Sequence, residues 1–490
     1  MRLPGKGLRS AVEGTMAYLI FIYAGGIAVT AVLAAASGIL AKMVYLLGCV
    51  GLSVWSSRRN PWDYLLLTLW IAAITPFARR LVDMQAGWDP TNIMLTAPFL
   101  VSALMIPSIL QRIRSLDAST ALFPGLAALC VFYGLIVALL RAEFAPALIG
   151  IGDWIVPIFY YFFVIAHRDR IPELIKRLPR FVTVNMLLLG TYGVWQFVDP
   201  PVWDRVWMQS VDQGAFGLPE PFMIRVFSTM NSTGPFSCWI MVLIIISFAF
   251  TSALMPIARL AGVLSLAFTF VRTSWAGFAV ALLVLIISSG RAAIRYAVVV
   301  AIVGLSIFAA VVFVPQINEM ISQRIATFDN LEQDGSILER EEEASRMQIL
   351  IADHPLGVGI GTLGRGTIVA NSGQILFVGA IDDGILEIFG SLGWLFGLVY
   401  CGALIGMVFQ GSRWGLQFAR EQKVCFAAGL ACLAALPMTT IVTGVTGTIM
   451  WLMFGLSSAL RSEEGRTNQR DYANRPAQRF DPSATGWGNL

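Results

Sequence analysis

Long apolar runs follow one another along almost the whole chain, and each is close to the length of a helix that spans a membrane. A spanning helix needs roughly 20 apolar residues, and its backbone polar groups must be hydrogen-bonded within the segment, because lipid offers them no partner. The pattern predicts twelve to fourteen spanning helices, since several of the fourteen runs are short or interrupted by Gly or Pro. The runs cover residues 17–36, 38–56, 62–78, 91–110, 121–140, 147–166, 181–198, 228–250, 256–270, 273–289, 292–314, 381–409, 422–437 and 439–460.

The composition points to the same class of protein. Of the 490 residues, 57% are hydrophobic and 13% are charged, whereas soluble domains carry about 25% charged residues. We therefore expect an all-α polytopic integral membrane protein. The six cysteines all fall inside apolar runs, so we interpret them as packing residues rather than as a disulfide or metal framework. The net charge of +4 carries little information by itself, and we expect no nucleic-acid partner.

The basic residues give the chain an orientation. The N-terminal run resembles a signal peptide, but it is too long for one and more runs follow, so we interpret it as an uncleaved first helix. If the N-terminus is cytoplasmic and fourteen helices alternate, 23 of the 34 basic residues lie inside and 11 outside. The bias is strongest at residues 168–180 and agrees with the positive-inside rule. Both termini are therefore predicted to be cytoplasmic.

One long polar segment, Pro315 to Ala380, interrupts the apolar pattern and falls on the outside in this topology. It carries nine acidic residues against four arginines and is rich in glycine. The chain is thus expected to have helices one to eleven in residues 1–314, an outer loop or lid at 315–380 and the last three helices at 381–460. Residues 461–490 are polar and are expected to form a disordered cytoplasmic tail.

Two arginines at the predicted outer face are candidate ligands for an anion. Arg272 lies between two runs with almost no loop, and ionisable residues at membrane depth are functional candidates; the alternatives are a snorkelling side chain or an ion pair. Arg225 begins the segment that ends with Asn231-Ser-Thr-Gly-Pro, which predicts an irregular helix start. Irregular backbone at that depth is tolerated where it lines a cavity, although a capped and kinked helix with an interfacial arginine is the alternative.

Within the outer loop, residues 337–352 have helical periodicity with glutamates in an early turn. Most of those glutamates are expected to form a solvated face. Arg346 and Arg340 are further candidate anion ligands, and Arg346 is expected either to remain on that face or to turn inward. The Gly-x-Gly-x-x-Gly spacing at 359–364 has no βαβ unit around it, so we expect a close-packed turn rather than a dinucleotide site.

Three carboxylates open the run that follows the loop, and they are candidate catalytic groups. One of Asp382 and Asp383 is explained as a helix N-cap, but together with Glu387 they exceed what capping requires. A carboxylate at the mouth of a cavity can act as a general base, and Asp382 is the first candidate. His354 is an alternative acid or base, with loop packing as its other role. The ligand spacing does not support a metal site.

These blocks, in this order, resemble the O-antigen ligase/O-antigen polymerase family of bacterial envelope glycosyltransferases. The similarity covers roughly residues 215–400, while the first 200 residues are similar only as a hydrophobic pattern. At Asp382 the ligases of the family carry a histidine, and aspartate is more usual in polysaccharide polymerases, which favours a polymerase. The similar blocks are Arg225-Val-Phe-Ser-Thr-Met-Asn231, Thr269-Phe-Val-Arg272-Thr-Ser-Trp275, Arg346 to Gly361 and Asp382 to Gly393.

The resemblance implies a fold similar to that of the C-type glycosyltransferases and a metal-independent, inverting transfer at the periplasmic face of the inner membrane, with no cofactor. The donor would be an undecaprenyl-diphosphate-linked oligosaccharide, and the acceptor a sugar hydroxyl. Arg225 and Arg272 would hold the diphosphate, Arg346 would assist, and Asp382 would accept the hydroxyl proton. Membrane lipids, a flippase and a chain-length regulator are the implied partners.

Two other functions stay open on the sequence. A ligase that transfers the glycan to another acceptor shares the chemistry. A lipid-linked oligosaccharide flippase or secondary transporter belongs to a different class, in which coupling charges lie near mid-depth and inverted repeats are frequent. The chain has no recognisable repeat, and its candidate charges gather at one face, which favours an enzyme.

Overall fold

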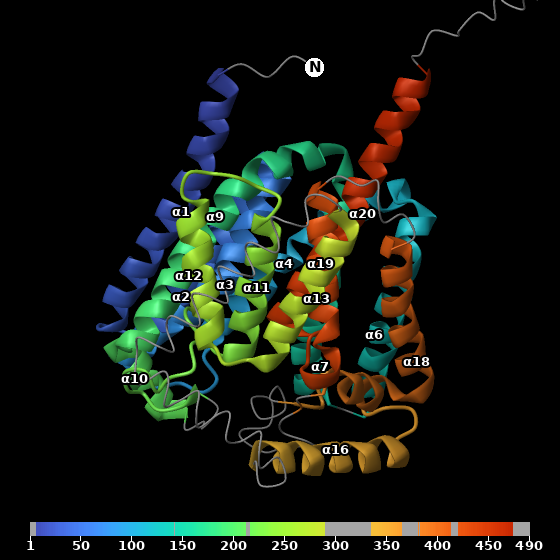
Figure 1. Cartoon of the computed structure of the whole chain (residues 1–490). Helices are drawn as coiled ribbons and strands as arrows, with labels where there is room; N and C mark the ends of the chain where they lie inside the picture. Colours follow the sequence, from blue (N-terminus) through green and yellow to red (C-terminus); the bar gives the residue numbers. More distant parts are fainter. Residues whose placement is uncertain are drawn as a thin grey trace, which may run out of the picture.

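The computed structural model describes residues 6–141, 143–211, 216–289, 335–364, 381, 383–412 and 420–473. The regular elements in these ranges are helices, with one isolated bridge between Gly217 and Ile224. Figure 1 shows most of them as a bundle of long, roughly parallel helices. The expected all-α class is confirmed.

Helices lie over each predicted run within the described residues, although some bounds differ, as in α9, which begins ten residues before the run 181–198. The run at 292–314 lies outside the described residues. The main helices are α1 (Lys6–Ala34), α2 (Gly38–Arg59), α3 (Pro61–Ala86), α4 (Ala97–Ala103), α5 (Met105–Arg112), α6 (Ala118–Leu140), α7 (Phe144–Gly150), α8 (Val156–Ala166), α9 (Ile171–Val198), α10 (Val202–Val211), α11 (Thr233–Ser247), α12 (Met255–Phe268), α13 (Arg272–Ser289), α16 (Gly335–Asp353), α18 (Gly384–Ser412), α19 (Arg420–Ala434) and α20 (Gly444–Ala473).

Among the described residues, seven helical segments are long and apolar enough to cross a membrane, and five apolar helices are shorter. The protein is therefore a multi-pass membrane protein. The seven segments are Gly38–Arg59, Pro61–Ala86, Ile93–Arg112, Ala118–Leu140, Phe144–Ala166, Arg168–Val198 and Gly384–Ser412. Several of them are built from consecutive shorter helices, and the segment from Phe144 contains a π-helical turn, Ile151–Ile155.

Helices far apart in the sequence pack as neighbours: α8 lies against α20, α9 against α12, α13 against α19, and α6 against α18. Small residues allow some of these pairs to approach closely, as is usual between helices in membranes. A Cβ atom added to Gly190 of α9, for example, would lie 2.9 Å from the carbonyl carbon of Ala261 in α12.

The two ends of the bundle differ. Figure 1 shows the start of α1 and the end of α20 at one end, and α10 and α16 at the other, with α16 lying across the helix ends. The start of α1 and the end of α20 thus lie at the same end, as expected if they share a side of the membrane. Their assignment to the cytoplasm stays a prediction.

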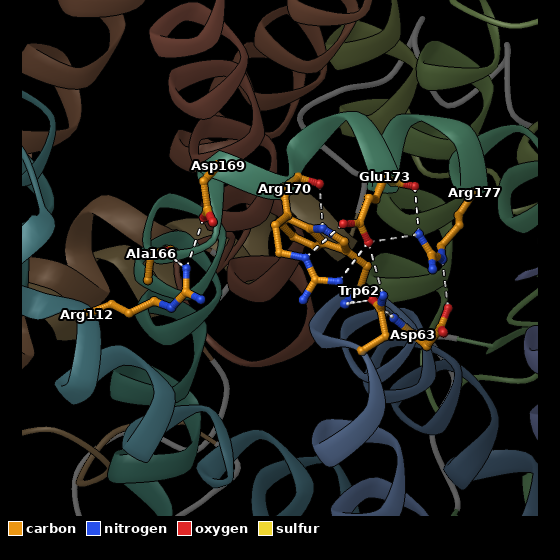
Figure 2. Close-up of polar contacts among 9 residues, drawn as sticks. Trp62, Asp63, Arg112, Ala166, Asp169, Arg170, Glu173 and Arg177 are labelled. Carbon is orange, nitrogen blue, oxygen red and sulfur yellow. Dashed lines mark hydrogen bonds and ion pairs between the residues drawn. The ribbon is translucent and has the colours of Figure 1, made fainter. Parts of the chain in front are cut away.

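The basic cluster that set the predicted orientation forms an ion network between the starts of α3 and α9 (Figure 2). Arg177 donates to Asp63 at 2.9 Å, and both side chains are more than nine-tenths buried. Arg170 pairs with Glu173 at 2.9 Å, and its carbonyl oxygen accepts the indole N–H of Trp62. These arginines therefore join helices as well as marking one side of the bundle.

One expectation about the C-terminus is corrected. Helix α20 continues to Ala473, so residues 461–473 are helical and not disordered as predicted. The polar stretch contains arginine, glutamate and glutamine, which propagate a helix well once an apolar segment has started it. Residues 474–490 lie outside the described part of the chain.

Candidate functional site

The segment from Arg225 to Ser232 is an irregular connection at the end of the bundle where α10 and α16 lie, as its sequence predicted. It follows the Gly217–Ile224 bridge and precedes α11. The backbone N–H of Arg225 donates to the carbonyl of Phe216 at 2.8 Å, and that of Val226 donates to Phe268 at 3.0 Å. The second bond attaches this segment to the end of α12.

The structure places the Arg225 and Arg272 blocks side by side. The Arg225 guanidinium donates from Nε to the carbonyl of Thr269 at 3.3 Å and from Nη2 to that of Phe270 at 3.4 Å. Helix α13 begins two residues later, at Arg272. The Arg225 side chain is half-buried and that of Arg272 is exposed. The Arg225 guanidinium therefore lies beside the backbone that leads directly into Arg272.

Neutral polar residues follow both arginines in the sequence. Asn231 is half-buried, and its Oδ1 has no hydrogen-bond partner among the described residues. The hydroxyls of Ser237 in α11 and Ser274 in α13 are hydrogen-bonded at 2.7 Å, which joins the first turns of these two helices. Guanidinium, amide and hydroxyl groups can all donate hydrogen bonds to phosphate oxygens.

Asp383 caps α18. Its Oδ1 accepts hydrogen bonds from the backbone N–H groups of Ile385, at 2.8 Å, and Leu386, at 3.0 Å. This is the geometry of a helix N-cap, so the capping role expected for one of the two aspartates falls on Asp383. Asp382 lies outside the described residues, and its role as the base stays a prediction.

Glu387 lies one turn further along α18, and its side chain is buried, with the residue 8% exposed. Its Oε2 has no hydrogen-bond partner within the described ranges. It interacts electrostatically with Asp153, which lies in the π-helical turn Ile151–Ile155. Single π-helical turns are frequent at functional sites. Sequence reasoning missed Asp153, although an acid inside the apolar run 147–166 was a visible signal.

His354 directly follows α16 and is half-buried. The guanidinium of Arg141, which ends α6, lies 3.3 Å from its Nδ1 and 3.4 Å from the carbonyl of Gly357. Because arginine can only donate, Nδ1 accepts. In the sequence, Arg141 was only one of the 11 basic residues predicted to lie outside. Its partner His354 is 213 positions away, so the contact could not be seen in the sequence.

Arg346 is on the solvated face of α16. Its side chain is 65% exposed and pairs with Glu342 at 2.6 Å. Of the two orientations that the sequence left open, the structure has the outward one, while the neighbouring Met347 is fully buried and packs with Leu363. Arg340 belongs to α16, but its side chain lies outside the described part.

The glycine-rich segment after α16 is packed tightly between helices, as predicted. Its backbone N–H groups donate to helix carbonyls: Val358 to Gly390 of α18 at 2.9 Å, and Ile360 to Gly134 of α6 at 3.1 Å. Gly359 has φ +96°, and an added Cβ would lie 2.5 Å from the backbone nitrogen of Ala138. These glycines attach the outer segment to the bundle and leave no space there for a dinucleotide.

The candidate residues thus form two groups at one end of the bundle. Arg225, Asn231 and Arg272 gather where α11, α12 and α13 meet, and Asp383 and Glu387 lie in the first turns of α18, with α16 across that end (Figure 1). Within the described ranges, no group of three or more His, Cys, Asp or Glu side chains is arranged to hold a metal ion.

Comparison with known proteins supports the family resemblance. Residues 257–401 match the family model described as O-antigen ligase. The matched segment includes Arg272, α16 and the first turns of α18, while Arg225 precedes it. No curated protein matches the chain. This part of the chain is therefore similar to the O-antigen ligases.

Proposed function

Because residues 257–401 match the O-antigen ligase family, we propose that the protein is a bacterial envelope polysaccharide polymerase. It joins repeat units carried on undecaprenyl diphosphate at the periplasmic face of the inner membrane. The observation that carries the proposal is the meeting of Arg225 and Arg272, since the Arg225 guanidinium is hydrogen-bonded to carbonyls two and three residues before Arg272.

The arginine pair fits the charge that the reaction develops. When the glycosidic bond to the diphosphate breaks, its electron pair leaves on a phosphate oxygen. Arginine stays protonated and can form two parallel hydrogen bonds to a phosphate, so two of them at one surface stabilise the leaving group. Arg346 and Arg340 on α16 are proposed to meet the donor when the outer segment closes over it.

The acceptor hydroxyl attacks the anomeric carbon from the face opposite the diphosphate, which inverts the configuration. Asp382 takes the hydroxyl proton as the new carbon–oxygen bond forms. Asp383, which caps α18, fixes the start of the helix directly after this base. Glu387 and His354 are the alternative proton acceptors. Transfer of this kind needs no metal, because the arginines stabilise the diphosphate.

A ligase is the second candidate, since the matching family model is described as an O-antigen ligase. It would use the same donor and differ in the acceptor. In both cases the protein is expected to work with a flippase that delivers the donor and a regulator that sets chain length.

Analysis of the surface glycan in a deletion strain separates these functions. The proposal predicts glycans of a single repeat unit and recovery of long chains when the gene is restored. Free polymer that is not attached to its acceptor would indicate a ligase. Lipid-linked units trapped on the cytoplasmic side would indicate a flippase and overturn the proposal. With purified protein, activity that survives a chelator is expected, and its loss would overturn the metal-free mechanism.

A further inference from the structure

A buried ion pair joins α3 to α10 at the end of the bundle where α16 lies. Arg80 of α3 donates to Asp204 of α10, and both side chains are fully buried. Burying two charges costs desolvation energy that their attraction only partly offsets, so such a pair is weak evidence for stability alone. The other hydrogen bonds of Arg80 and Asp204 indicate which part of the chain this pair fixes in place.

Those bonds lead to the connection that carries Arg225. Arg80 donates from Nη2 to the carbonyl of Ser228 at 2.6 Å. Gln196 of α9 donates to Oδ2 of Asp204 at 2.6 Å, and its own Oε1 accepts the backbone N–H groups of Phe227, at 3.0 Å, and Ser228, at 2.8 Å. Side chains from α3 and α9 therefore satisfy consecutive backbone groups of one short segment, and Asp204 of α10 binds both of these side chains.

The backbone held in this way is in an unfavourable conformation. Ser228 has φ +49°, in the left-handed region that non-glycine residues seldom adopt. Its hydroxyl donates to the carbonyl of Leu189 at 2.7 Å, and the hydroxyl of the next residue, Thr229, donates to Ala73 at 2.8 Å. Such conformations persist where the surroundings over-determine them, and they cluster at functional sites.

We propose that Arg80, Gln196 and Asp204 are positioning residues that fix the Phe227–Ser228 backbone and thereby hold the Arg225 guanidinium beside Arg272. The inference rests on the proposed function of the arginine pair. Their hydrogen bonds to this segment reach Phe227 and Ser228, which follow Arg225 in the chain. All three precede the segment that matches the family model, which begins at residue 257.

The test compares the affinity of purified protein variants in lipid nanodiscs for undecaprenyl diphosphate. Gln196→Met removes the acceptor of two backbone N–H groups at little change in volume, and Asp204→Asn removes the charge that orients Arg80. Each is expected to weaken binding by about tenfold or more, as follows from misplacing one charge-assisted contact. Asp63→Asn is the control, because Asp63 and Arg177 form another ion pair at the other end whose side chains are more than nine-tenths buried; it should change binding by less than about twofold.

A second pair of variants tests the backbone without disturbing a buried charge. Ser228→Gly keeps the left-handed conformation accessible, whereas Ser228→Val, with its branched Cβ, opposes it. The proposal expects the valine variant to bind undecaprenyl diphosphate about tenfold more weakly than the glycine variant. Equal binding by the two would overturn it, even if Asp204→Asn fails to fold.

The outcomes separate this inference from the function on which it rests. If Arg225→Ala abolishes binding while Gln196→Met and Ser228→Val leave it unchanged, the arginine site stands and the positioning role is wrong. If the unaltered protein does not bind undecaprenyl diphosphate, the proposed function fails, and the inference fails with it. If Asp63→Asn weakens binding as much as Asp204→Asn, the effect is general destabilisation and the positioning role is overturned.

Discussion

Substitution of Asp383 separates the two roles that its carboxylate can have, as a helix cap and as a proton acceptor. Oδ1 accepts the backbone N–H groups of Ile385 and Leu386. Asp383→Ala removes both bonds and the negative charge, whereas Asp383→Asn and Asp383→Ser keep an oxygen in the capping position. The asparagine and serine variants are therefore the matched controls for the alanine variant.

The magnitudes follow from this geometry. Loss of an N-cap costs about 0.5–2 kcal/mol, and loss of a negative charge at a helix N-terminus costs about 0.3–1 kcal/mol more. Asp383→Ala should thus lower the free energy of unfolding by about 1–3 kcal/mol, and Asp383→Asn by less than about 1 kcal/mol. A general base, in contrast, contributes about 10²- to 10⁴-fold to the rate.

The assay measures thermal unfolding and turnover of an undecaprenyl-diphosphate-linked repeat unit for each variant. If Asp383 caps α18 and Asp382 is the base, Asp383→Asn keeps turnover within about tenfold of that of the unaltered protein. Asp383→Ala then unfolds at a lower temperature than Asp383→Asn. A fall of about 10²-fold or more in the asparagine variant, with unfolding unchanged, would refute this assignment.

Three further predictions address packing, buried charge and topology. Gly359→Ala should destabilise the protein by about 1–3 kcal/mol or more, because its Cβ meets the backbone of α6. At Gly364, which has a similar φ, an added Cβ meets no atom of the described residues within 4 Å, and equal loss of thermal stability in both variants would exclude the steric cause. Glu387→Gln should raise the unfolding temperature, because it removes an ionisable group whose Oε2 is buried without a described partner next to Asp153; a marked fall would show that the carboxyl group is paired. A periplasm-dependent reporter inserted near residue 335 should be active and one near 470 silent, and the reverse result would overturn the orientation.

The helices were largely predictable from the sequence, because a crossing of the membrane imposes a length and an apolar composition that a single run reveals. The helix at 337–352 was recovered as α16 from its periodicity, and the short connection before Arg272 was also correct. Disorder at 461–473 was wrong, since α20 continues through a polar stretch whose residues favour helix.

The connections between elements were not predictable. Arg80 and Asp204 lie 124 positions apart and looked like unrelated polar residues, and the left-handed conformation of Ser228 has no signature in a serine. Asp153 becomes a candidate only because folding places it near Glu387, and Arg141 only because folding places it beside His354. A single sequence locates charges along the chain, but their pairing depends on tertiary contacts.

The most direct test of the central claim measures chain growth by purified protein from an undecaprenyl-diphosphate-linked single repeat unit. Arg225→Ala and Arg272→Ala should each lower the rate of polymer formation by about 10²- to 10³-fold, as expected when a group that stabilises developing charge is lost. Arg205→Ala is the control, because Arg205 is an outer arginine paired with Asp199, and it should leave the rate within about twofold. Near-normal chain growth by either Arg225→Ala or Arg272→Ala would contradict the claim that these two arginines hold the diphosphate.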